Sequence, residues 1–177
     1  MKVLVSSLFF AAFVFVHNAG AQELVGVKVL DPESKSYFEL RNDGGTWLKA
    51  QQRAAGLVYK GIRGRLAVVE NPGVHSFLRE TFKIRHATWI GLRYWCKFRA
   101  LQWVTGSIHK ASEFSPWAAR WKRENDLAPC TGASTKQTGF MPVYYTPVSK
   151  GFRWQAVDSG KGFKWYFVEY PAAAEAE

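Results

Sequence analysis

Cysteine, histidine and acidic residues are all scarce in this chain. It contains two Cys and four His in 177 residues, and 24 Lys and Arg outnumber 14 Asp and Glu. Two cysteines exclude a disulfide-rich small scaffold and an all-cysteine zinc site, because each of these needs more thiols. At most one disulfide bond can form within the chain.

Catalytic motifs are missing as well. The three histidines beyond residue 21 are His75, His86 and His109, and no two of them have metal-ligand spacing. The sequence also lacks a Gly-x-Ser-x-Gly string, a phosphate-binding loop and a paired-carboxylate motif. His75 falls in a predicted helix, where we expect a surface or hydrogen-bonded side chain. A triad can assemble from distant residues, but nothing in the sequence points to one, so it predicts a protein that is not an enzyme.

Beyond residue 21 the sequence contains no apolar run of membrane-spanning length. Residues 1–21 are typical of a secretory signal peptide, with Lys2 before an uncharged run at 3–16 and with Ala19 and Ala21 at the cleavage-determining positions. The run is shorter than the roughly 20 residues that cross a bilayer. A retained anchor or a buried strand is the alternative. We expect cleavage to give a secreted or periplasmic chain that begins at Gln22 and has no transmembrane segment.

Basic and aromatic residues are abundant instead. Eight Trp contribute to an aromatic content of 16%, and the formal net charge is +10. Residues 85–123 hold eight Lys and Arg against Glu113 alone, and Trp95, Trp103, Trp117 and Trp121 are interleaved among them. A surface of this kind attracts anions through its positive potential.

Apolar periodicity predicts one α+β domain over residues 22–170, followed by an acidic, disordered tail at 171–177. A helix is expected at 46–60 with Trp47, Ala50 and Ala54 on its apolar face, together with Leu57 and Val58. Asn71 and Pro72 are typical of the start of a second helix. Strands are expected at residues 25–30, 36–41, 66–69, 88–92, 101–104, 142–145, 152–157 and 163–170. Residues 106–140 should form a long functional loop, since idle loops of this length are uncommon.

The order of several short strings resembles the C-type lectin-like domain family. These strings are Trp47-Leu48-Lys49-Ala50, Gly64-Arg65-Leu66-Ala67, Phe77-Leu78, Trp89-Ile90-Gly91-Leu92, Trp103-Val104-Thr105-Gly106, Arg153-Trp154 and Tyr166-Phe167-Val168-Glu169-Tyr170. They extend over nearly all of the expected mature chain, and the version at residues 61–67 is more similar to bacterial members of the family. The resemblance implies a C-type lectin-like fold, in which two helices flank antiparallel sheets and a long loop carries ligand specificity.

Departures from the family pattern concern a disulfide bond and calcium. Val168 and Ala54 stand near positions where family members often have a cysteine pair. Calcium-dependent sugar binders of the family carry Trp-Asn-Asp in the penultimate strand, whereas this chain has Trp154, Gln155 and Ala156 there. The loop also lacks the Glu-Pro-Asn or Gln-Pro-Asp signature. No metal or other cofactor is therefore expected, and calcium held by Glu124, Asn125 and Asp126 is a weaker alternative, because calcium needs six to eight oxygen ligands.

The loop offers residues for binding an anionic glycan. Tryptophan rings stack on the apolar faces of sugars, and Arg pairs with carboxylate, sulfate or phosphate groups. The predicted ligand-binding residues are Trp117, Arg120, Trp121, Lys122, Arg123, Glu124, Asn125 and Asp126. For the two tryptophans, packing in the protein interior is an equal alternative. Trp89 and Trp103 are expected in the core, because each lies in an apolar strand pattern.

Cys96 and Cys130 are expected to form a disulfide bond, with two free thiols as the alternative. Export favours the bond, and closing a loop of this length contributes about 3–4 kcal/mol to stability. Together these features predict a non-catalytic binding protein for an extracellular or cell-envelope glycan. A protein-interaction or adhesion module on the same fold is the alternative, while export makes nucleic acid a poor candidate.

Overall fold

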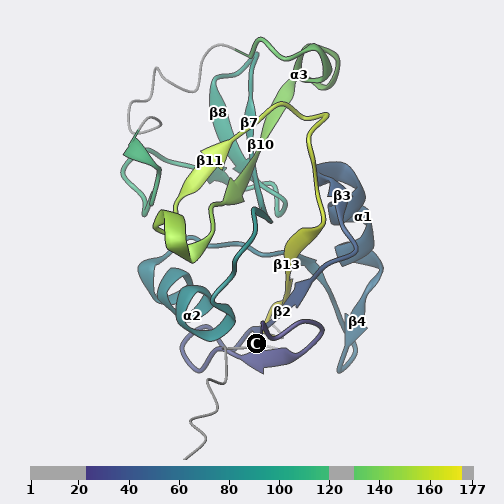
Figure 1. Cartoon of the computed structure of the whole chain (residues 1–177), viewed down its shortest axis with the longest axis vertical. Coiled ribbons are helices and arrows are strands. Elements are labelled where there is room, and N and C mark those ends of the chain that lie inside the picture. The colour runs from purple at the N-terminus through teal and green to yellow at the C-terminus, as the bar shows by residue number, and fades with distance from the viewer. Residues whose placement is uncertain (1–22, 120–129, 173–177) are drawn as a thin grey trace, which may run out of the picture.

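The structure, a computed structural model, describes residues 23–119 and 130–172 (Figure 1). Its longer helices are α1 (Trp47–Gly56) and α2 (Pro72–Phe82). The chain also forms the short helix α3 (Ala133–Thr138) and the 3-10 turn η2 (Val148–Lys150). The strands are β1 (Lys28–Leu30), β2 (Tyr37–Arg41), β3 (Gly45–Thr46), β4 (Val58–Tyr59), β5 (Ile62–Arg63), β6 (Arg65–Leu66), β7 (Thr88–Trp95), β8 (Ala100–Trp103), β9 (Ile108–His109), β10 (Phe140–Tyr145), β11 (Trp154–Ala156), β12 (Gly162–Phe163) and β13 (Trp165–Tyr170). This is the predicted α+β class.

One sheet dominates the described part of the chain. Its strands follow the order β1-β2-β13-β7-β10-β11, with β6 also paired to β13 and the β8–β9 pair extending from β7. Neighbouring strands are antiparallel except β13 and β7, which run parallel where Tyr166 faces Trp89. Two small ribbons, β3–β12 and β4–β5, complete the strand pairing. The strand β11 ends the main path, so one of its edges is available to the long loop.

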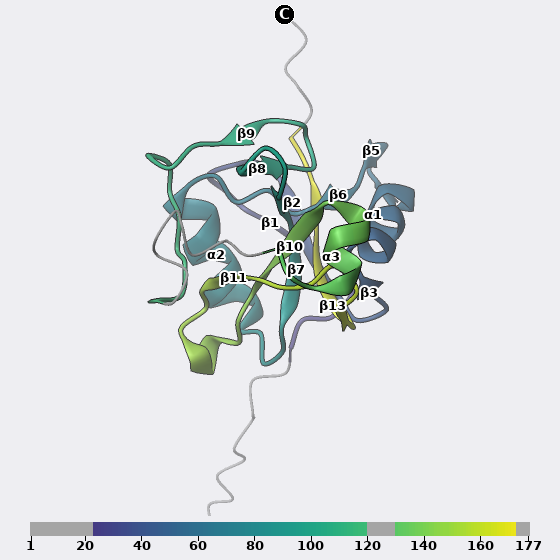
Figure 2. The ribbon, with the colours of Figure 1, turned by 90° about the horizontal axis from the view of Figure 1, so that it is seen from above.

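The two longer helices lie on opposite sides of this sheet (Figure 2). On the α1 side, Trp47, Ala50 and Ala54 pack with Trp89 and Tyr166. On the α2 side the core includes Val74, Leu78, Phe82, Ile90, Leu92, Trp103 and Trp154. Trp89 and Trp103 are fully buried, as predicted. Alternation along β7 explains both clusters, because successive side chains of a strand point to opposite faces.

The first helix is shorter than its apolar pattern predicted. Thr46 precedes it without donating or accepting a side-chain cap bond, and the helix ends at Gly56. The β4–β5 hairpin then turns at Gly61, whose φ of 79° suits glycine. Val58 is consequently 60% exposed instead of joining the apolar face.

The second helix begins as predicted. Asn71 accepts a hydrogen bond from the Val74 amide at 2.9 Å, and Pro72 occupies the first helical turn. His75 is buried, and its Nδ1 atom shares a 2.8 Å hydrogen bond with the Tyr145 hydroxyl. It is therefore a hydrogen-bonded histidine of the core.

The expected strand at residues 25–30 is only partly formed. β1 spans Lys28–Leu30, while Val25 makes an isolated bridge to Leu40. Val25 and Val27 are exposed. Val29, which lies within β1, packs against the core.

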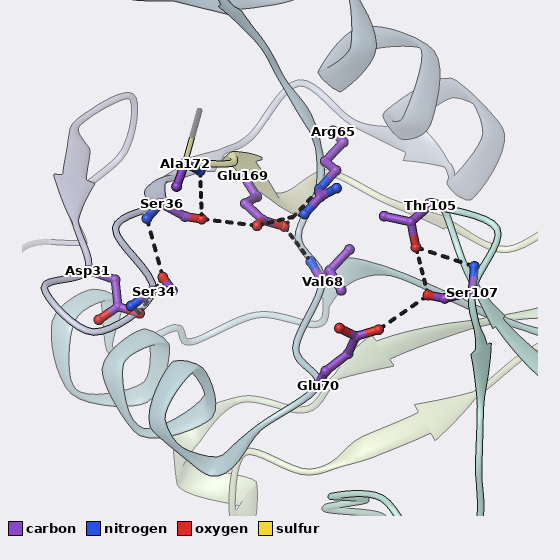
Figure 3. Close-up of polar contacts among 10 residues, drawn as sticks. All are labelled: Asp31, Ser34, Ser36, Arg65, Val68, Glu70, Thr105, Ser107, Glu169 and Ala172. Carbon is purple, nitrogen blue, oxygen red and sulfur yellow. Dashed lines mark hydrogen bonds and ion pairs between the residues drawn. The ribbon is translucent and has the colours of Figure 1, made fainter. Parts of the chain in front are cut away.

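A buried carboxylate holds the last strand to the rest of the sheet (Figure 3). Glu169 on β13 accepts two hydrogen bonds from the Arg65 guanidinium, at 3.0 and 2.9 Å. It also accepts bonds from the Val68 amide at 2.9 Å and the Ser36 hydroxyl at 3.2 Å. A buried charge is tolerated when its lone pairs are satisfied in this way. Glu169 therefore joins three segments that are distant in sequence.

Candidate functional site: the stems of the long loop

The long loop begins as an ordered hairpin rather than an irregular segment. β9 pairs antiparallel with β8, with His109 opposite Leu101 and Ile108 opposite Gln102. Gly106, at a φ of 93°, makes the turn between these strands. The beginning of the predicted loop is thus an extension of the main sheet.

His109 fixes the next turn of the loop. Its side chain is buried, with Nε2 2.8 Å from the Ser115 hydroxyl and Nδ1 3.2 Å from the Glu113 carboxylate. The ring packs edge-on against Trp103 and Trp154. Burial lowers the pKa of His109, while the Glu113 and Glu70 carboxylates oppose the shift. The histidine is therefore favoured in its neutral form.

These three residues have the order and distances of a Ser-His-acid triad, but the chemistry is incomplete. The Ser115 hydroxyl donates to the Glu113 carbonyl at 3.1 Å. Pro116 follows the serine and has no backbone N–H, so the usual oxyanion donor next to a nucleophile is absent at that position. The hydrogen bonds of His109 and Ser115 stabilise this turn.

Trp117 anchors the first stem of the loop in the core. The Trp154 amide donates to the Pro116 carbonyl at 2.9 Å, and the Ala118 amide donates to the Trp154 carbonyl at 3.0 Å. The rings of Trp117 and Trp154 meet edge to face with centroids 5.5 Å apart. Trp117 is 9% exposed, so its ring is packed in the protein interior. This is one of the two interpretations that the sequence left open. The stem adds a short parallel bridge to the edge of β11.

The second stem is fixed by the disulfide bond between Cys96 and Cys130, which confirms the predicted pairing. Directly after it, α3 begins over the Asp158 carboxylate. Asp158 accepts hydrogen bonds from the Thr135 and Gly160 amides at 3.0 and 2.9 Å. These hydrogen bonds lower the pKa of Asp158 against the opposing effect of desolvation. Gly132 contacts this carboxylate so closely that a Cβ atom would collide with it.

Most predicted ligand-binding residues cannot be placed. Arg120, Trp121, Lys122, Arg123, Glu124, Asn125 and Asp126 lie outside the described residues, and only Trp117 lies within them. What the structure provides is the pair of anchored stems on either side of this segment. They bring residue 119 and residue 130 to the β11 edge and the β7 end of the same sheet.

The residues of β11 do not fit a calcium site. Gln155 follows Trp154, and its Oε1 atom accepts a 2.7 Å hydrogen bond from the Tyr144 hydroxyl. Ala156 is buried and has no oxygen ligand in its side chain. Among residues 23–119 and 130–172, no group of three or more His, Cys, Asp and Glu side chains could hold a metal ion. A calcium ion would need oxygen ligands that this strand does not supply.

A cluster that the sequence did not single out lies on the opposite face of the sheet, around Arg93. Its guanidinium is centred 4.5 Å from the Trp95 ring and 5.6 Å from the Trp47 ring. Gln102 accepts hydrogen bonds from Arg93 Nη2 at 3.1 Å and from Trp95 Nε1 at 2.8 Å. The signal in the sequence was an arginine in an apolar strand, two positions from a tryptophan, where both side chains share one face.

Comparisons with known proteins place this geometry in one fold. The domain of cow CD23, described as a C-type carbohydrate-recognition domain in the presence of a GlcNAc2Man3 oligosaccharide, superposes with a TM-score of 0.58 at 17% identity, covering 79% of this chain and 91% of its own. Human lithostathine gives a TM-score of 0.58 at 19% identity, covering 77% and 83%. A calcium-independent type II antifreeze protein gives 0.55 at 17% identity, covering 78% and 88%.

The chain therefore has the C-type lectin-like fold, as its sequence strings implied. No protein-family model matches the chain, and no curated protein matches it by sequence. Identities below one fifth establish the architecture without assigning a ligand. Within the described residues, no helix has the length and apolar character needed to cross a membrane.

Proposed function

We propose that this chain is an exported, non-catalytic binding protein that recognises carbohydrate, preferably an anionic glycan, through residues 106–140. The observation that carries the proposal is the pair of anchors, since Trp117 packs on Trp154 and Cys130 is bonded to Cys96. A loop held at both stems loses less conformational entropy when it binds a ligand. The resemblance of residues 61–67 to bacterial members leads us to propose a bacterial-type variant of the fold.

Each loop residue has a proposed role. Trp121 stacks on the apolar face of a sugar ring, while Arg120, Lys122 and Arg123 pair with its anionic groups. Glu124, Asn125 and Asp126 accept hydrogen bonds from sugar hydroxyls. Trp117, which the sequence also offered as a stacking residue, has its ring packed in the core and anchors the first stem of the loop.

A glycan array probed with the purified protein tests the proposal. We expect the protein to bind acidic glycans more strongly than neutral ones. This binding should weaken with salt and persist in the presence of a chelator. Trp121→Ala should remove most of the binding, while Arg63→Gln, an exposed arginine on the β4–β5 hairpin, should leave it unchanged. Binding that needs calcium would instead assign the metal to the loop. Unchanged binding by Trp121→Ala would contradict the stacking site.

The second candidate is a protein-interaction or adhesion module. It is favoured by β11, where Gln155 and Ala156 replace the carboxylate-bearing pair of the calcium-dependent sugar binders. The solved structures of similar fold include one described as a calcium-independent type II antifreeze protein. A protein that binds no glycan on the array, with or without calcium, would favour this candidate.

Export is part of the proposal. The disulfide bond is consistent with an oxidising compartment, such as a periplasm or the extracellular space. Mass measurement of the exported protein should give a chain that begins at Gln22. A chain that retains residues 1–21 would indicate an uncleaved anchor.

A further inference from the structure

Arg93 differs from the paired arginines of the described chain. Arg41, Arg65 and Arg79 each form an ion pair with a carboxylate. Among the described residues, Arg93 has no such partner, and its hydrogen bond there goes to the neutral amide of Gln102. The cation therefore has no counter-ion within residues 23–119 and 130–172.

Aromatic rings surround this guanidinium on the α1 side of the sheet. The rings of Trp95, Trp47 and Phe140 have centroids 4.5, 5.6 and 5.8 Å from its central carbon. Their faces carry partial negative charge and attract the cation, but they cannot accept its N–H groups as a carboxylate would. In Figure 2, α1 and α3 both lie on this side of the sheet. Arg93 and Trp95 are both half-buried.

The hydrogen bonds around Arg93 are directed and incomplete. Gln102 donates its amide to the Gly106 carbonyl at 3.0 Å, which orients its oxygen toward Arg93 and Trp95. Arg93 Nε is buried and has no hydrogen-bond partner in the described part of the chain. Burial lowers the pKa of Arg93, although an arginine stays protonated under any ordinary condition. Nε is closed off from solvent, so a ligand would bind the terminal Nη groups of this half-buried side chain. A partly desolvated guanidinium is complementary to an oxyanion, because its two terminal nitrogens can bind carboxylate or sulfate in a forked geometry.

We propose that Arg93, supported by Trp95 and Gln102, is a binding site for the sulfate or carboxylate group of an anionic ligand. The site lies on the other face of the sheet from the Trp117 stem of the long loop. Arg93 shares its face with Trp47 on the α1 side, whereas Trp117 and Trp154 belong to the α2 side. It therefore goes beyond the proposed function and stands or falls independently of it.

Inorganic sulfate is the first probe, titrated into the ¹⁵N-labelled protein at constant ionic strength with chloride as the balancing ion. Each of the eight Trp contributes one indole N–H resonance, and Trp95→Phe identifies the resonance of interest. We expect this resonance to shift saturably, with a dissociation constant on the order of 1 mM. A shift that increases linearly with sulfate concentration, or that chloride reproduces, would overturn the proposal.

Variants then test the guanidinium itself. Arg93→Gln should weaken sulfate binding at least tenfold, and Arg93→Lys should weaken it less, because it keeps the charge and loses the fork. Arg63→Gln removes the same charge from an exposed strand and should leave the affinity unchanged. Equal weakening by Arg63→Gln would show that net charge alone attracts the ion and would overturn the proposal.

Three sugars distinguish a sulfate ester from a carboxylate as the anionic group of the ligand. Galactose 6-sulfate, galacturonic acid and galactose are titrated in the same way. A saturable shift of the Trp95 resonance with the sulfated sugar alone would assign a sulfate ester, and a shift with galacturonic acid alone a carboxylate. Equal shifts with neutral galactose would contradict an anion site, even if the glycan array shows binding through the loop.

Discussion

Trp117 and Trp154 meet edge to face, with ring planes at 84°, although they are more than thirty positions apart in the sequence. The contact joins the first stem of the long loop to the last strand of the main sheet path. An edge-to-face pair of this kind contributes about 0.5–1.5 kcal/mol beyond the area it buries. The loop is therefore attached to the core by a side chain that the sequence alone could equally have assigned to the ligand.

Removing the Trp117 ring should destabilise the protein. Trp117→Ala should lower the free energy of unfolding by about 3 kcal/mol, because it leaves a cavity against Trp154. Trp117→Phe, the matched control, should lose less because it keeps an aromatic contact. Urea denaturation followed by far-ultraviolet circular dichroism measures both. Equal stability of Trp117→Ala and the unmodified protein would mean that the ring is not packed in solution.

The disulfide bond should stabilise the fold by restricting the unfolded chain. Cys96 and Cys130 are separated by 34 positions, for which the expected contribution is about 3–4 kcal/mol. The double replacement Cys96→Ser with Cys130→Ser should lose this amount in urea denaturation. Reduction of the denatured protein should add the mass of two hydrogens, and an unchanged mass would show that the thiols were free.

Glu169 should contribute more to the stability of the fold than an exposed carboxylate does. Glu169→Gln removes the charge that faces Arg65 and replaces one acceptor of the Val68 amide or Ser36 hydroxyl with a donor. We expect a loss of about 2–3 kcal/mol in the free energy of unfolding. The control is Glu80→Gln, whose pair with Arg79 is exposed and should contribute little. Similar losses for the two variants would contradict the assignment of Glu169 as a buried linker.

Stability should fall in mildly acidic solution because of His75. Burial, with smaller effects from Arg79 and Arg153, lowers the pKa of His75 to about 4, compared with about 6.5 in the unfolded chain. Between these values the unfolded state binds the proton and the folded state does not, so stability decreases as pH falls from 6.5 to 4. The expected loss across this window is about 2–3 kcal/mol.

The histidine contribution is isolated by a variant. His75→Gln can still accept a hydrogen bond from Tyr145 but does not titrate. Urea denaturation at pH 7 and at pH 4.5 should show a larger decrease for the unmodified protein than for His75→Gln. Equal decreases would indicate that carboxylates, rather than His75, set the acid sensitivity.

Local patterns predicted much of the fold. The Asn71 cap with Pro72, the strand at residues 88–92 within β7 and the buried face of α1 all depend on residues near one another in the sequence. The end of α1 was missed because Leu57 and Val58 continue the helical periodicity while the backbone already turns into a hairpin. The strand predicted at residues 25–30 began too early, because the alternation of valines does not show where strand pairing starts.

The candidate site was less predictable for a physical reason. Whether Trp117 packs or stacks depends on Trp154, and whether Arg93 is paired depends on every carboxylate that the fold brings within reach. Such contacts are set by long-range pairing and not by the residues beside them. The sequence by itself determined the α+β class, the family of folds, the basic aromatic character and the only available disulfide bond. Only the tertiary structure decided that Trp117 lies in the core and that Arg93 stands among rings with no carboxylate partner in the described part of the chain, since burial is a property of the neighbours that folding assembles.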